Sequence, residues 1–397
     1  MLAYINKSTL KTICDNMGVQ HTYIADAVKC KPAAKVNDWM NESSSSLPTF
    51  NQAKKIAKCL KVPFAGLYMN PDDVRKIKVP QLTSRRTFPD GYLRDESSLN
   101  IAVADLLTSR DFLLSMNAEL NEQIPIFNIS IPHEDNPLLW ANSIRQLFGI
   151  SLSEQFKFTS SRQFYLYVRK QVEAKGIFVH CFTDVYLQMA RGLAIYNDIM
   201  PIIGINADDR YPAKIFTIIH ELTHILKRQS SVCNEIFNSF TQQQEEIFCN
   251  AVAGEVLIPT ESLEIKLNSP AYDGDITVAV IDSLSKTYSV SKEVVARRLL
   301  DTGKISNISY DTYIDEFKRA LEREKEELKV AKLEGRSSQF RRNPSRDAID
   351  KNSSSICLAL FKGFGDDLYS KRDVCRYLGI SQKYADRFLT EVSKWNN

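Results

Sequence analysis

The sequence has no apolar run that approaches the roughly 18 residues of a membrane-spanning helix, and no secretory signal opens it. Its eight cysteines include no pair separated by two residues. This scatter disfavours a cysteine zinc site and a disulfide framework, and it is typical of reduced thiols in a cytosol. The content of 44% hydrophobic and 25% charged residues is that of an ordinary globular protein, here of two or three domains. We therefore expect a cytoplasmic protein without membrane association.

Histidine is also scarce, yet two of the five histidines, His220 and His224, stand four residues apart. The surrounding segment, 215–226, is mostly apolar and predicts a buried helix with both imidazoles on one face. Glu221 completes the His-Glu-x-x-His pattern of zinc peptidases, which combines two imidazole ligands with a carboxylate base. The alternative is a core helix with two hydrogen-bonded histidines. Two buried imidazoles beside a buried carboxylate are costly without a metal, so the pattern favours a metal site.

A catalytic zinc site needs a third protein ligand and an open position for water. The helix predicted from about Gln242 onward offers Glu246, with Asn250 four residues later on the same side. Glu245 competes for the role of third ligand.

The same helix resembles one in the ImmA/IrrE family of metallopeptidases. The family pattern is Glu-x-x-(Ala/Cys)-Asn-x-Phe-Ala with a Leu-Leu-Met-Pro-like end. This chain has Glu246-Ile-Phe-Cys-Asn-Ala-Val-Ala253 and then Leu-Ile-Pro259. Val252 replaces the usual phenylalanine, which changes packing but no ligand. The resemblance implies Zn²⁺ bound by His220, His224 and Glu246, with Glu221 as the general base.

The N-terminal module is basic, because residues 1–80 hold 12 Lys/Arg against 6 Asp/Glu. Helix signals predict a small bundle over 1–70 and an irregular linker over 71–97. The helices are expected at 7–17, 20–29, 34–41 and 50–61. The segment 47–68 resembles the last helix of XRE-type repressor domains. The segments 22–28 and 36–40 have the layout of a helix-turn-helix, with Lys31, Lys35 and Asn37 as candidate DNA contacts.

The DNA interpretation of this module has two rivals. The turn of the expected helix-turn-helix lacks the usual glycine, and its second helix offers few side chains that read bases. Sequence-specific DNA binding, a degenerate helical module for protein contact or autoinhibition, and nonspecific contact with nucleic acid all stay open. The basic bias does not choose among them.

The peptidase-like domain is expected over 98–305. It begins with helices near 98–123, 136–148 and 160–174, followed by a strand at 176–182 and a hairpin of 192–196 with 201–206. Family members have a similar plan. An edge strand over 192–197 would hold an extended peptide, with Gly192, Ala194 and Tyr196 as candidate substrate contacts. His180 is a candidate fourth ligand, but a lone histidine in an apolar strand favours a structural role.

The segment 276–305 predicts two helices joined by a turn, which we interpret as part of the peptidase domain rather than a second DNA-binding unit. The C-terminal helical region, 306–397, opens with a charged helix at 310–334, either a solvated arm or a partner helix. The basic stretch 341–346 fits a loop paired to the body or a phosphate contact. The final helices, at 354–363, 370–378 and 381–395, resemble the tail of longer, prophage-type family members.

These patterns predict an α+β, mostly helical chain. A helix-turn-helix-like bundle precedes a zincin-like peptidase domain with a small β-sheet and a C-terminal helical region. The expected activity is zinc-dependent endoproteolysis, although manganese or iron could occupy the same ligands. The resemblance implies a regulatory substrate, such as a repressor or antitoxin, cut in a stress, mobile-element or phage-defence response. Further expected partners are DNA at the N-terminal module and a second copy in a homodimer. The alternative is a non-proteolytic regulator that keeps the metal for structure.

Overall fold

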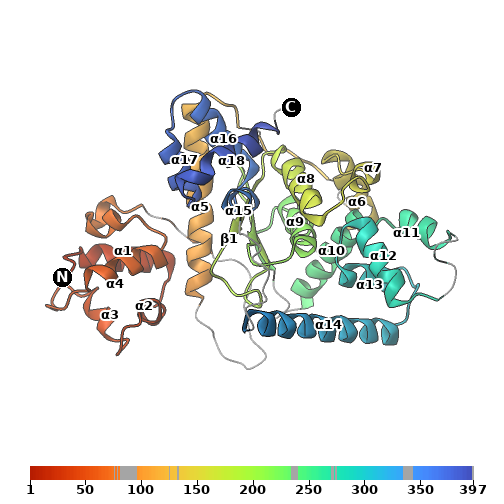
Figure 1. The fold of residues 1–397 in the computed structure, drawn as a ribbon, viewed down its shortest axis with the longest axis horizontal. Coiled ribbons are helices and arrows are strands. Elements are labelled where there is room, and N and C mark those ends of the chain that lie inside the picture. Colours follow the sequence, from red (N-terminus) through yellow and green to blue (C-terminus); the bar gives the residue numbers. More distant parts are fainter. Residues whose placement is uncertain are drawn as a thin grey trace.

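The computed structural model describes residues 1–75, 77, 79–80, 96–124, 126–131, 134–233, 240–269, 272, 275–333 and 343–395. Helices surround one small β-sheet (Figure 1), which confirms the α+β, mostly helical fold class. Within these residues, no helix combines the length and the apolar character needed to cross a bilayer. Most of the predicted linker 71–97, and Arg341 and Arg342 of the basic stretch, lie outside the described residues.

The N-terminal residues form a small helical bundle. Its helices begin at capping residues: Asn6 accepts a hydrogen bond from Thr9 N, and Thr49 forms a capping box with Gln52. The inner faces close an apolar core around the fully buried Trp39. The elements are α1 (Lys7–Met17), α2 (His21–Val28), α3 (Lys35–Asp38), α4 (Phe50–Cys59), η1 (Phe64–Tyr68) and η2 (Pro71–Asp73). The helix expected over 34–41 is thus only one turn long.

The bundle packs against α5 (Ser97–Glu119), the first helix of the rest of the chain, which we call the body (Figure 1). Ile101 and Ala104 of α5 are buried in the bundle's own apolar core. Polar contacts flank this seam, since Lys61 Nζ lies 2.9 Å from Asp105 Oδ2 and Asn100 donates to the carbonyl of Gly18. The bundle and the body therefore share one packed interface.

The sheet contains β1 (Phe178–Phe182), β2 (Gly192–Ile195), β3 (Ile202–Asn206) and β4 (Ser231–Cys233), in the order β1-β3-β2-β4. β1 runs parallel to β3, whereas β2 is antiparallel to both of its neighbours. The pairing of β2 with β3 confirms the predicted hairpin. The prediction that 192–197 is an edge strand is wrong, because β4 pairs with the other side of β2. The error arose because β4 is too short to be recognised in the sequence.

The two faces of the sheet contribute to two different cores, as the alternation of side chains along a strand requires. Val179, Ile203 and Ile205 face the helices that include α9 (Tyr211–Leu226). Phe178 and Phe182 face α5 and the C-terminal helices. The helices on the α9 side of the body are α6 (Pro137–Leu147), α7 (Leu152–Gln155), α8 (Ser161–Glu173), α10 (Phe240–Leu257), α11 (Thr260–Leu267), α12 (Val278–Tyr288), α13 (Lys292–Asp301) and α14 (Asn307–Leu333).

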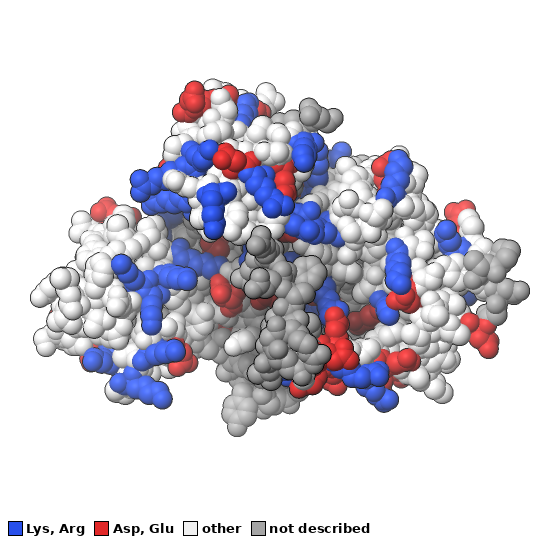
Figure 2. Space-filling view, in the orientation of Figure 1, with Lys and Arg blue, Asp and Glu red and all other residues white. Residues whose placement is uncertain are grey.

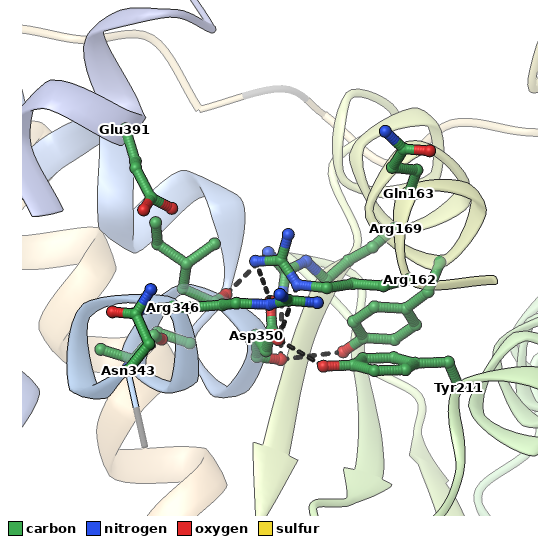
Figure 3. A network of polar contacts seen from close by, with 12 residues as sticks. Arg162, Gln163, Arg169, Tyr211, Asn343, Arg346, Asp350 and Glu391 are labelled. Carbon is green, nitrogen blue, oxygen red and sulfur yellow. Dashed lines mark hydrogen bonds and ion pairs between the residues drawn. The ribbon is translucent and has the colours of Figure 1, made fainter. Parts of the chain in front are cut away.

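A buried network of hydrogen bonds and ion pairs connects the C-terminal helices to this body (Figure 3). Arg169 of α8 is 1% exposed and donates to the carbonyl oxygens of Ile349 (3.0 Å) and Asp350 (3.1 Å). The Asp350 carboxylate accepts from Arg162 (2.8 Å) and from the hydroxyl of Tyr211, at the start of α9. Breaking such a buried pair costs about 3–5 kcal/mol, so these contacts fix the region in place. The region consists of α15 (Pro344–Lys351), α16 (Ser354–Gly365), α17 (Lys371–Leu378), η4 (Gln382–Tyr384) and α18 (Ala385–Ser393).

Candidate metal centre

Helix α9 carries the His-Glu-x-x-His residues through the interior of the body. Apolar residues on several sides of this helix are fully buried, including Ile218, Ile219 and Leu222. His220, Glu221 and His224 are also buried, at 0%, 0% and 3% exposure. Such a helix is stable only if its polar side chains find partners inside the protein.

The partner of the two histidines is Glu246 of α10, a helix that packs against α9. Glu246 Oε2 lies 3.0 Å from His220 Nε2, and Glu246 Oε1 lies 3.4 Å from His224 Nε2. The two Nε2 atoms are 3.3 Å apart. A tetrahedral zinc with bonds of about 2.0–2.1 Å separates its ligand atoms by about 3.3 Å. Glu246 reaches the two imidazoles with different oxygens, and one ligand atom from each of the three residues lies within 4.8 Å of the others, which is close enough to share one cation. These three residues are the only such group among the described residues.

The electrostatics of the cluster also favour a cation. Burial raises the pKa of Glu246, but the hydrogen bonds with His220 and His224 outweigh it and lower the pKa to about 2. Burial lowers the pKa of His224, but the contacts with Cys249 and Glu246 outweigh it and raise the pKa to about 11. The cluster thus stabilises a positive charge at its centre, which a proton or a metal ion can supply. Two imidazoles and one carboxylate are the donor set of a catalytic zinc site.

One comparison with known proteins matches part of the chain. Residues 173–300 match the family model of the IrrE N-terminal-like domain, Peptidase_M78. The matched segment carries a peptidase-type domain. It runs from the end of α8 to α13 and includes His220, Glu221, His224 and Glu246. The match supports the resemblance to ImmA/IrrE over this part of the chain. No curated protein matches the chain.

Within the matched segment, only one carboxylate oxygen of Glu221 has a hydrogen-bond partner among the described residues. Its Oε2 accepts a hydrogen bond from Ser231 Oγ of β4 at 2.9 Å, while its Oε1 is buried without a partner among the described residues. Burial raises the pKa of Glu221, and Glu246 adds to this, although the two imidazoles act against it. Ser231 is a contact that the sequence did not reveal, since nothing in a serine after a helix indicates where it pairs.

The three candidate substrate contacts lie on or beside β2, but β4 takes up that side of the strand. Gly192 pairs with Cys233, and Ala194 pairs with Ser231. The backbone N–H of Tyr196 donates to Ser230 Oγ, and its hydroxyl donates to Asp198. Direct main-chain binding of a peptide by Gly192 or Ala194 is therefore incompatible with this arrangement.

Gly192 has a different role, because it allows β2 to lie close to α9. A Cβ at this position would stand 2.2 Å from Thr217 Cγ2 and 2.9 Å from Glu221 Oε1. We expect Gly192→Ala to lower the free energy of unfolding by about 1–3 kcal/mol, as overpacking does elsewhere. Denaturant unfolding would measure this loss. Gly303→Ala is not a suitable control because of its positive φ, whereas Gly365→Ala has open space around its Cβ and should change stability little.

Two rival ligands lie apart from the cluster. Glu245 Oε1 accepts a hydrogen bond from Gln229 at 3.0 Å. His180 Nδ1, in β1, accepts from the backbone N–H of Ser353 at 3.2 Å. Burial lowers the pKa of His180 to about 4, so the imidazole is neutral at pH 7 and supports the packing of α16. The fourth-ligand interpretation of His180 has no support in this geometry.

The candidate DNA contacts are remote from the metal centre. Lys31, Lys35 and Asn37 are all exposed, on α3 or in the turn before it. A helix of one turn presents few side chains to a DNA groove. Their DNA-binding role stays a prediction.

Proposed function

We propose that the chain is a zinc-dependent endopeptidase, with His220, His224 and Glu246 as metal ligands and Glu221 as the general base. One observation carries the proposal: His220, His224 and Glu246 each offer a ligand atom within 4.8 Å of the others, beside the buried Glu221 and inside a segment that matches a peptidase family. We prefer zinc because the donors are two imidazoles and one carboxylate. Manganese and iron are the alternatives, and reloading the metal-depleted protein with each ion distinguishes them.

The residues have separate tasks in this mechanism. His220, His224 and Glu246 would hold the zinc, which would lower the pKa of a bound water toward neutrality and polarise the carbonyl of the scissile peptide. Glu221 takes the proton from the attacking water and delivers it to the leaving nitrogen. Ser231 fixes the Oε2 side of the carboxylate, which leaves Oε1 as the oxygen that accepts the proton.

The proposed substrate is a regulatory protein, such as a repressor or antitoxin, cut in the cytoplasm during a stress, mobile-element or phage-defence response. The resemblance to ImmA/IrrE supports this class. In the same proposal the N-terminal bundle binds DNA or a partner protein, and the chain acts as a monomer or a homodimer.

A second candidate is a non-proteolytic regulator in which the metal is structural. The observation in its favour is that a peptide has no direct access to β2 or to Glu221. β4 pairs along β2, and Glu221 is 0% exposed. A protein with this closed arrangement would bind metal and partners but leave peptide bonds intact.

The deciding experiment is a search for new protein N-termini. The purified protein would be metal-depleted, reloaded with zinc, manganese or iron, and incubated with the product of a neighbouring gene or an extract of the host cell. Mass spectrometry of labelled N-termini should find cleavage with one reloaded form and none with the depleted form. Metal bound at one equivalent, with no cleavage under any condition, would favour the regulator.

A further inference from the structure

Helices α17 and α18 are joined in the manner of a helix-turn-helix. α17 ends at Leu378, and Gly379 follows in the left-handed conformation with φ 65°. The turn is closed by a hydrogen bond from Ile380 N to the carbonyl of Cys375 at 3.1 Å. After Ser381 the chain enters η4 and then α18. A three-residue turn with glycine between two helices is the layout of the DNA-binding motif.

The inner faces of this pair are apolar and closed. Val374 of α17 and Phe388 and Val392 of α18 are fully buried in the core that α5 and the sheet share. Ala385 of α18 is also fully buried. The carbonyl of Tyr384 accepts a hydrogen bond from Ser345 of α15 at 2.8 Å. The second helix is therefore held rigidly, with a single face left to solvent.

That free face is polar and has the side chains that read bases. The exposed residues of η4 and α18 recur at the spacing of one helix face: Gln382, Lys383, Asp386, Arg387 and Thr390. Lys and Arg pair with guanine, Gln with adenine and Asp with cytosine in the major groove. The face therefore offers hydrogen-bonding groups for each of these bases.

The charge of the unit matches a polyanion. Residues 371–395 hold six Lys/Arg and three Asp/Glu, and Arg372 and Arg376 are exposed on α17. Figure 2 shows Lys and Arg gathered on the lobe formed by the C-terminal helices, with acidic side chains among them. The pairs Lys371–Asp386 and Arg387–Glu391 are solvent-accessible, and such surface pairs are weak enough to open for a phosphate or a base.

We propose that α17, η4 and α18 form a helix-turn-helix that binds duplex DNA, with the exposed face of η4 and α18 in the major groove. Arg372 and Arg376 contact the phosphates, and Gln382, Lys383 and Arg387 contact base edges. This site is separate from the peptidase centre and does not depend on its activity.

Two other helix pairs lack one of these features. α12 and α13 have the same layout, but their surface holds as many acidic as basic residues: Asp282, Glu293 and Asp301 against Lys286, Lys292 and Arg297. In the N-terminal bundle the second helix, α3, is a single turn. Of these three described helix pairs, only α17 and α18 combine a full second helix with a net positive surface.

The lobe is also joined to the metal helix. α15 lies between them, since Ser345 contacts Tyr384 at one end and Asp350 contacts Tyr211 at the other. Tyr211 is the first residue of α9. DNA bound at α18 would thus be connected, through the contacts of α15, to the helix that carries His220 and His224.

The test uses the full-length protein and a pool of random-sequence duplexes about three helical turns long. Duplexes retained by the wild type are amplified and sequenced, and the affinity for the enriched duplex is measured by fluorescence anisotropy. The variant Lys383→Glu/Arg387→Glu removes two contacts, so it should bind at least about tenfold more weakly. The control Lys318→Glu/Arg319→Glu makes the same charge change at exposed positions of α14 and should bind within about twofold of the wild type. Circular dichroism checks that each variant is folded.

Several outcomes would overturn the proposal. These are no enrichment of any duplex sequence, an equal loss of affinity in both double variants, or an unchanged affinity in Lys383→Glu/Arg387→Glu. A loss confined to Lys31→Glu/Lys35→Glu would assign DNA binding to the N-terminal bundle instead. Displacement of the duplex by single-stranded RNA at the same concentration as by unlabelled duplex would also contradict it.

Discussion

Glu221→Gln is expected to slow peptide-bond cleavage by about 10²–10⁴-fold, the range that a positioned general base contributes. Glutamine has nearly the same shape and can still accept the hydrogen bond from Ser231, but it cannot take a proton from water. Because Glu221 is not among the three clustered ligand atoms, the variant should bind metal as the wild type does. The measurement is the initial rate of cleavage at the bond found by the N-terminus search, together with the metal content per chain.

Ser231→Ala is the matched control for this substitution. It removes the 2.9 Å hydrogen bond to Glu221 Oε2 but leaves the carboxylate itself. Loss of one positioning contact should slow cleavage by about 10–100-fold, less than Glu221→Gln, since a hydrogen bond to a charged group is worth about 1.5–3 kcal/mol. Undiminished cleavage in Glu221→Gln would exclude this residue as the base. An equal loss in both variants would instead point to distortion of the strand contact with β4.

The proximity of His220 and His224 was predictable because their geometry is local. Two histidines four residues apart must share a face of a helix, and the apolar residues around them required that the helix be buried. Glu246 was harder, since the choice against Glu245 depends on how α10 is rotated against α9. The structure turns Glu246 toward both imidazoles and Glu245 toward Gln229.

The features that escaped prediction depend on contacts between distant segments. β4 is three residues long, and only its pairing with β2 identifies it as a strand. The strand pattern predicts Gly192 as a substrate contact, whereas its missing Cβ is needed where α9 lies close to the strand. The docking of the C-terminal helices relies on the buried Arg169, and a single arginine in an amphipathic helix gives no sign of a partner 180 residues away.

The position of β4 has a consequence for the proposed peptidase. An extended peptide that paired directly with β2 would have to displace Ser231 and Val232. The same displacement would remove the hydrogen bond from Ser231 to Glu221 and expose the carboxylate. Access of a peptide to β2 and exposure of the base are therefore coupled through one short strand.

Glu246→Ala is expected to weaken metal binding by more than about 100-fold, the upper effect of substitutions that only support a ligand. It removes one of three ligand atoms and leaves His220 and His224 alone to hold the ion. It also removes the carboxylate that stabilises a positive charge between the imidazoles. Competitive titration with a chelator of known affinity would measure the change. The zinc-dependent rise in melting temperature should vanish in parallel, because a ligand stabilises the fold only in proportion to its occupancy.

Glu245→Ala provides the control, since it changes the adjacent residue of the same helix in the same way. Its carboxylate accepts a hydrogen bond from Gln229, at the end of α9, and takes no part in the cluster. Its metal affinity should therefore stay within about threefold of the wild type, below the tenfold effect of losing a supporting contact. The opposite pattern, with metal lost in Glu245→Ala and kept in Glu246→Ala, would show that α10 turns its other carboxylate to the ion. The distances of 3.0 and 3.4 Å from Glu246 to the two imidazoles support the expected pattern, in which Glu246→Ala loses the metal and Glu245→Ala keeps it.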